Sequence, residues 1–157
     1  MISSRIRALA ALAGIAAATS CVAAEKGEFG SAGEAKAMVE NAVAELRQNE
    51  STAMIDFNNP GGMFRDRDLY VFCFNTTTAR FTAHINSTLI GTDVRTLYKP
   101  DGTSLGQKVF DAAVTAREGT VVTVTYDFPR PGSGTPVPKE SYVARIGATA
   151  CGVGYYK

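Results

Sequence analysis

The chain has 157 residues, of which 45% are hydrophobic and 20% are charged, with 16 Lys and Arg against 15 Asp and Glu and a single histidine. This near-neutral balance gives no electrostatic reason to expect nucleic acid or an anionic membrane surface as a partner, and no nucleic acid is predicted. The length suits one domain with a core of its own.

Residues 1–24 have the pattern of a cleavable signal peptide. Arg5 and Arg7 supply a positively charged start, residues 8–18 form a short alanine-rich apolar run, and small residues follow it. The run is shorter than the roughly 20 apolar residues that a membrane-spanning helix needs. We therefore expect export to the periplasm with cleavage after residue 24. Lipoprotein processing at Cys21 is a less favoured alternative.

Residues 25–157 are then expected to form one domain that contains two cysteines, Cys73 and Cys151. Export would place them in an oxidising compartment, where a disulfide can form. The alternative is a pair of buried thiols that pack as small apolar side chains. Composition alone leaves both possibilities open.

The first element after the leader is a predicted helix. Ser31 and Glu34 have the S-x-x-E form of a capping box, in which each side chain satisfies a free backbone N–H at the helix start. Apolar residues then recur at helical spacing and predict one buried face. These residues are Ala35, Val39, Ala42, Val43 and Leu46. A second, shorter helix is predicted over residues 51–58, where the sequence NPGG ends it.

The hydrophobic period then changes from that of a helix to that of strands. Strands are predicted over residues 68–75, 80–85, 119–128, 139–147 and 150–157. The first of them has apolar side chains on both faces, as in a central strand. An apolar stripe over residues 105–116 predicts another helix before the third strand. This order predicts an α+β fold: a five-stranded antiparallel sheet, with the long first helix on one face and the other helix and loops on the opposite face.

Five segments occur in the order and spacing of one known family: DLYVFCFN, AHINSTLIGTDVRTL, DGTSLGQKVFDAA, VTYDFPRPGSGTPVPKESYV and GVGYYK. On these segments the chain resembles single Cache domains of the second type (sCache_2), which are extracytoplasmic sensor modules of bacteria. The resemblance covers nearly all of residues 25–157. It implies a PAS-like Cache fold with sheet order 2-1-5-4-3, counting the predicted strands along the chain, and a pocket between the sheet and its covering loops.

The resemblance also implies a function. Such domains typically bind small organic molecules, often short carboxylates, and pass the signal to a histidine kinase or a chemoreceptor. We therefore expect a periplasmic sensing module for a small organic acid. Because the sequence ends on a strand and not on a transmembrane helix, it is expected to be a stand-alone domain that feeds a separate membrane protein. The alternative is a ligand-independent partner that modulates such a receptor.

The sequence shows no constellation of catalytic or metal-binding residues. Its single histidine, His84, has no Cys or carboxylate near it at the spacing of metal ligands. Walker, G-x-S-x-G and Rossmann motifs are also missing from the sequence. We predict no enzyme activity, no metal site and no cofactor.

A pocket for a small anion needs an apolar, aromatic wall and a few well-placed donors. The candidates on the predicted strands are Tyr70, Phe72, His84, Tyr126, Phe128, Lys139 and Tyr142. By the resemblance, Lys139 matches the family's lysine and would neutralise a carboxylate, and His84 stands where the family commonly has histidine. The alternatives are core packing for the aromatic residues, a solvated strand end for Lys139, and a structural hydrogen bond for His84.

The implied strand order makes the first and last strands antiparallel neighbours, so Cys73 and Cys151 could lie opposite each other. Both stand where the family more often has valine or isoleucine, and this joint departure favours a disulfide. A register shift of one residue would put them on opposite faces of the sheet. The two free thiols therefore stay open as the alternative.

Overall fold

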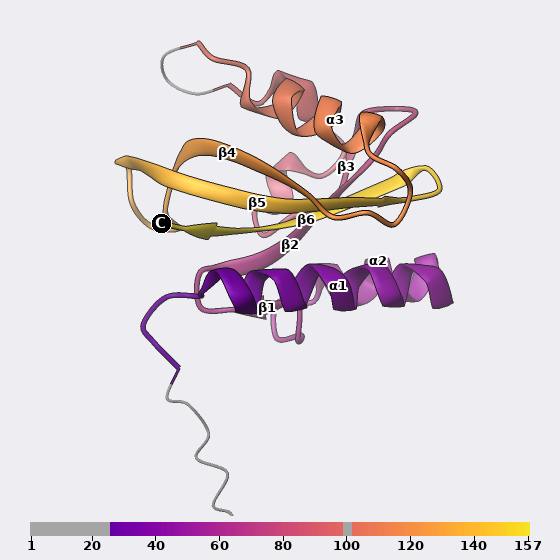
Figure 1. Ribbon diagram of the computed structural model, residues 1–157, viewed down its shortest axis with the longest axis horizontal. Coiled ribbons are helices and arrows are strands. Elements are labelled where there is room, and N and C mark those ends of the chain that lie inside the picture. The colour runs from indigo at the N-terminus through magenta and orange to yellow at the C-terminus, as the bar shows by residue number, and fades with distance from the viewer. Residues whose placement is uncertain (1–25, 99–101) are drawn as a thin grey trace, which may run out of the picture.

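The computed structural model describes residues 26–98 and 102–157 (Figure 1). The predicted leader, including Cys21, lies outside these residues. Within them, the structure is an antiparallel sheet with helices on both faces, so the predicted α+β class is confirmed.

Two consecutive helices cover one face of the sheet. Helix α1 spans Ala32–Gln48 and begins with the predicted capping box, in which Ser31 and Glu34 bond to each other's backbone N–H groups. Helix α2 spans Glu50–Asn58, and the side chain of Asn49 caps its start. No helix in the described part of the chain is long and apolar enough to cross a membrane.

In the described part of the chain the sheet has six strands: β1 Arg65–Asp66, β2 Leu69–Asn75, β3 Phe81–Ala83, β4 Val122–Pro129, β5 Pro136–Ile146 and β6 Thr149–Tyr156. Neighbouring strands follow the order β1-β2-β6-β5-β4, and β3 also pairs with β2. The pairings of the five predicted strands agree with the implied order. The structure differs by adding β1, a two-residue strand that pairs with the start of β2.

The two faces of the sheet are covered by different elements, as Figure 1 shows. Helices α1 and α2 lie on one side. The other side carries α3 (Leu105–Thr115) and the 3₁₀ helices η1 (Ser87–Leu89) and η2 (Val94–Thr96). Alternate residues of β2 enter the two cores: Leu69, Val71 and Cys73 pack towards α1, and Tyr70, Phe72 and Phe74 pack towards α3.

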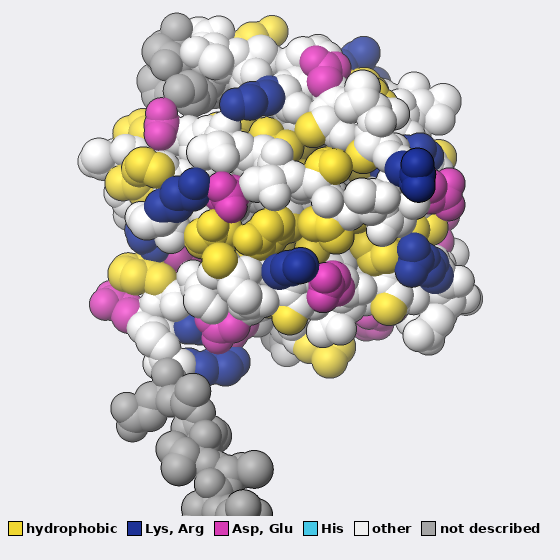
Figure 2. All heavy atoms as spheres, viewed as in Figure 1, with side chains coloured by type: hydrophobic (Ala, Val, Ile, Leu, Met, Phe, Trp, Pro, Cys, Tyr) yellow, Lys and Arg dark blue, Asp and Glu magenta, His cyan; other side chains and the backbone are white. Residues whose placement is uncertain are grey.

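Figure 2 shows one face of the surface, with positive and negative side chains interspersed and hydrophobic side chains gathered in a band where α1 meets the sheet. This view contains no large region of a single charge. The surface on this side is therefore in keeping with the near-neutral composition and offers no basic patch for a nucleic acid.

The two cysteines lie in the core under α1. Cys73 of β2 and Cys151 of β6 are direct partners across the central strand pair, with their Cα atoms 4.1 Å apart, and a disulfide joins them. Both side chains are fully buried. The bond links the two strands at the centre of the sheet across 78 positions of sequence.

Candidate functional site

A cavity of about 30 Å³ lies between the sheet and the elements η2 and α3. Six of the seven predicted site residues line it: Tyr70, Phe72, His84, Tyr126, Phe128 and Lys139. Apolar residues of η2 and α3, such as Val94 and Val109, complete its wall. The space suits about two water molecules, since one needs roughly 10–15 Å³.

Strand geometry explains why these residues meet. Side chains two residues apart share a face of a strand, so Tyr70 and Phe72 of β2 point the same way, and so do Tyr126 and Phe128 of β4. Lys139 of β5 lies directly opposite Tyr126 on one side and Tyr156 on the other. The register thus brings three strands to the same cavity.

Tyr142 is the predicted site residue that the structure places elsewhere. It lies three positions after Lys139 on β5 and therefore faces the opposite side of the sheet. There it packs against the core under α1 and stacks on Tyr155, with ring centroids 5.8 Å apart. The prediction that Tyr142 lines the cavity was therefore wrong, and the two-residue period of a strand explains why.

Lys139 is the most deeply buried charged residue of the site, with 2% of its surface exposed. Its Nζ donates to the phenol oxygens of Tyr70 (3.3 Å) and Tyr156 (3.4 Å). It also lies over the rings of Tyr70, Tyr156 and Phe128, at 4.7, 4.6 and 5.4 Å from their centroids. The alternative that Lys139 lies at a solvated strand end is therefore wrong.

The charge of Lys139 has little water around it. Burial lowers its pKa from 10.5 to about 8, the charge of Asp68 partly opposes this change, and the charge of Arg130 adds to it. Among the residues that the structure describes, its hydrogen-bond partners are two phenols and not a carboxylate. Lys139 is therefore a cation at neutral pH, and the charge of Asp68 compensates it only in part.

His84 lies beside this lysine and is 7% exposed. Its Nδ1 accepts the backbone N–H of Asn86 at 2.9 Å, which leaves Nε2 as the N–H donor of the neutral ring. Burial, and then the charge of Lys139, lower the pKa of His84 to about 4. At neutral pH the ring is uncharged and supplies a hydrogen-bond donor. The structural hydrogen bond considered from sequence is present as well.

Two further residues belong to the site although no sequence motif marks them. The hydroxyl of Ser141 lies 2.6 Å from that of Tyr126, whose pKa burial raises to about 12. Tyr156 holds Lys139 from the last strand and donates its own hydroxyl to the carbonyl oxygen of Pro129 at 2.6 Å. Ser141 could have been found from strand period, since it lies two residues after Lys139. The contact of Tyr156 with Lys139 could be found only from the register between β5 and β6.

The glycines of the last strand make room for the site. A Cβ at Gly154 would lie 2.4 Å from Cε of Lys139 and 2.5 Å from Oγ of Ser141. A Cβ at Gly152 would lie 2.5 Å from Cζ of Phe72. The alternation of glycine in GVGYY therefore allows the side chains of two neighbouring strands to cross over β6.

The site as a whole favours an anion. Its wall combines one ammonium group, one neutral imidazole donor and phenol hydroxyls, and none of the described residues that line it is Asp or Glu. Within residues 26–98 and 102–157, no group of three or more His, Cys, Asp or Glu is placed to hold a metal ion. The arrangement can bind and orient a small anion by charge and hydrogen bonds.

Comparisons with known proteins identify a matching family and a shared fold. The family model described as Single Cache domain 2 matches residues 18–154. A methyl-accepting chemotaxis protein from Vibrio parahaemolyticus RIMD 2210633 shares the fold with a TM-score of 0.62 at 19% identity, over 79% of this chain and 86% of that one. A structure titled as the periplasmic sensor domain of a chemotaxis protein has a TM-score of 0.55 at 27% identity, over 78% and 87%.

A third solved structure carries a title on carboxylic acid recognition by a Cache chemosensory domain. It has a TM-score of 0.57 at 20% identity and covers 78% of this chain and 85% of that one. No curated protein matches the chain. The structures below 25% identity show a shared fold.

Proposed function

Because the chain belongs to the single Cache domain 2 family, we propose that it is an extracytoplasmic sensing module whose cavity binds a small organic carboxylate. The domains of this family are ligand-binding modules, and no catalytic role is assigned to the cavity. The proposed ligand class rests on the charges and donors of this chain's own site.

The observation that carries the proposal is the setting of Lys139. The side chain is 2% exposed, yet its polar partners are the phenols of Tyr70 and Tyr156. A buried ammonium that lacks an anionic partner is costly, because hydrogen bonds to neutral groups recover only part of its hydration. A carboxylate in the cavity would supply the missing charge and accept hydrogen bonds from Lys139 and His84.

The cavity also restricts the size and charge of the ligand. About 30 Å³ is less than the space needed even by a small carboxylate, so the wall must widen when one enters. Amino acids are disfavoured, since none of the described lining residues is an acid that would hold their ammonium group. The proposed ligand is therefore a short carboxylate without an amino group.

Thermal unfolding in the presence of candidate ligands tests this proposal. At saturating concentration, acetate or propionate should raise the melting temperature of residues 25–157 by several degrees, whereas glycine, alanine and urea-like amides should not. Lys139→Met should abolish the shift, and Lys36→Met, a control on the exposed face of α1, should retain it. If no short carboxylate stabilises the wild-type protein, the proposal fails.

Location and signalling partner complete the proposal. We place the domain in the periplasm, exported by residues 1–24, where it would report to a membrane histidine kinase or chemoreceptor. Cell fractionation with and without that leader tests the location. Recovery of a receptor with the protein in the absence of any stabilising ligand would instead favour a ligand-independent partner.

A further inference from the structure

The ring of Tyr156 is shared by two cations. Lys139 Nζ lies 4.6 Å from its centroid, and Cζ of Arg130 lies at the same distance. Arg130 belongs to the loop between β4 and β5 and does not line the cavity. A residue outside the cavity therefore touches the same aromatic side chain as the ammonium group inside it.

Arg130 connects this ring to the segment that enters α1. It forms an ion pair with Asp68 at 2.8 Å and lies 4.0 Å from the ring centroid of Phe29. Asp68 is 7% exposed and accepts the backbone N–H of Gly30 at 2.7 Å through its other oxygen. Contacts thus run without a gap from Lys139 through Tyr156 and Arg130 to Phe29 and Gly30.

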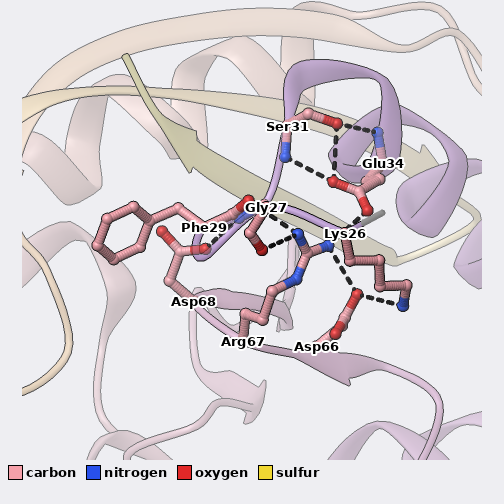
Figure 3. Close-up of polar contacts among 9 residues, drawn as sticks. Lys26, Gly27, Phe29, Ser31, Glu34, Asp66, Arg67 and Asp68 are labelled. Carbon is pink, nitrogen blue, oxygen red and sulfur yellow. Dashed lines mark hydrogen bonds and ion pairs between the residues drawn. The ribbon is translucent and has the colours of Figure 1, made fainter. Parts of the chain in front are cut away.

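The same segment is held from a second side, as Figure 3 shows. Arg67, in the turn between β1 and β2, donates to the carbonyl oxygens of Gly27 and Phe29 at 3.0 and 2.8 Å. Lys26 pairs with Asp66 at 2.8 Å. Residues 26–31 are therefore fixed by charged groups of β1, the turn that follows it and the loop between β4 and β5, and a change in the field at those groups acts on the segment directly.

We propose that binding of an anion in the cavity tightens the hold of Arg130 and Asp68 on residues 26–31, so that this segment reports the state of the ligand site. The inference rests on the proposed function, because it concerns regulation of the same cavity. Its direction follows from charge. Lys139 repels Arg130 and attracts Asp68, so its charge opposes the ion pair between these two residues, and a carboxylate that neutralises Lys139 removes both effects. Arg130 then binds Tyr156, Phe29 and Asp68 more firmly.

Hydrogen exchange of the Gly30 amide, followed by NMR, measures this hold, since its N–H donates to Asp68. With sodium acetate in place of sodium chloride at equal ionic strength, the exchange should slow by about fivefold or more. In Arg130→Gln the effect of acetate on Gly30 should be lost, and by reciprocity acetate should bind several-fold more weakly. Arg145→Gln is the matched control, because Arg145 has nearly the same side-chain exposure, 24% against 25%, and pairs with Glu118.

A second experiment measures the exchange of Gly30 in a variant and needs no ligand. Lys139→Met removes the repelling charge, so Gly30 should exchange more slowly than in the wild-type protein without acetate. If acetate stabilises the protein but leaves Gly30 unchanged, and Arg130→Gln binds it like wild type, the coupling is overturned while the proposed function stands. If acetate gives no stabilisation, the carboxylate proposal fails, and Lys139→Met still decides the coupling. An unchanged Gly30 in that variant contradicts it.

Discussion

Lys139 is held by many weak interactions that together do not replace its hydration. Each ring over a desolvated ammonium contributes up to about 2 kcal/mol, whereas the loss of water costs several kcal/mol per ion. The balance is visible in the pKa, which burial lowers from 10.5 to about 8. This change means that the folded protein destabilises the protonated form, relative to the neutral form, by about 3 kcal/mol. A bound anion can recover part of that free energy.

The depressed pKa of Lys139 predicts a particular pH dependence of binding. Lysine has its charge below its folded-state pKa, so carboxylate affinity should be constant from about pH 6 to 7.5 and fall above pH 8. Between pH 7 and pH 9 the dissociation constant should rise about tenfold, because one proton is lost per site. Isothermal titration with acetate at fixed ionic strength measures this. A lysine with an ordinary pKa near 10.4 would give a flat profile up to pH 9 and would contradict the assignment.

Individual elements differ in how well the sequence predicts them. The start of α1 follows from Ser31 and Glu34, because a capping box is a contact between near neighbours. The central position of β2 follows from its two apolar faces. Strand order came from the family resemblance, since no local pattern states which strands pair.

The site shows the same division between local and distant contacts. Lys139 and Ser141 share a face by strand period, and the same rule separates Tyr142 from them. The partners of Asp68 could not be predicted, because Arg130 lies 62 positions away and Gly30 38 positions away, on other elements. Such ion pairs and hydrogen bonds depend on the register and loops of the folded chain, and residue spacing does not encode them.

Strand β6 gives an element-scale prediction through Gly154. In Gly154→Ala the new methyl group would lie well inside van der Waals contact with Cε of Lys139 and Oγ of Ser141, so these side chains must move. We expect the free energy of unfolding to fall by about 1–3 kcal/mol, as for other overpacked sites, and acetate to bind more weakly. Denaturant unfolding and calorimetry measure both. Gly134→Ala is the control, since nothing lies within 4 Å of its Cβ position. Equal behaviour of the two variants would show that β6 does not need the space.

At the scale of the whole molecule, two cores share one sheet. The core under α1 contains the disulfide, and the core under α3 contains the cavity that Lys139 lines. Because β2 and β6 contribute side chains to both cores, a bond between these strands stabilises the frame on which Lys139 and its rings are placed. The disulfide thus supports the site without touching it.

This division of roles predicts that the disulfide contributes stability and leaves the ligand chemistry unchanged. Closing a loop of 78 residues lowers the entropy of the unfolded chain and corresponds to about 4.5 kcal/mol in the chain-entropy relation. A double variant, Cys73→Val with Cys151→Val, should therefore lose a few kcal/mol in denaturant unfolding. It should still bind acetate under conditions where it is folded. Reductant should lower the stability of the wild-type protein towards that of the variant and should not affect the variant. Two reactive thiols in unfolded, unreduced residues 25–157 would contradict the bond.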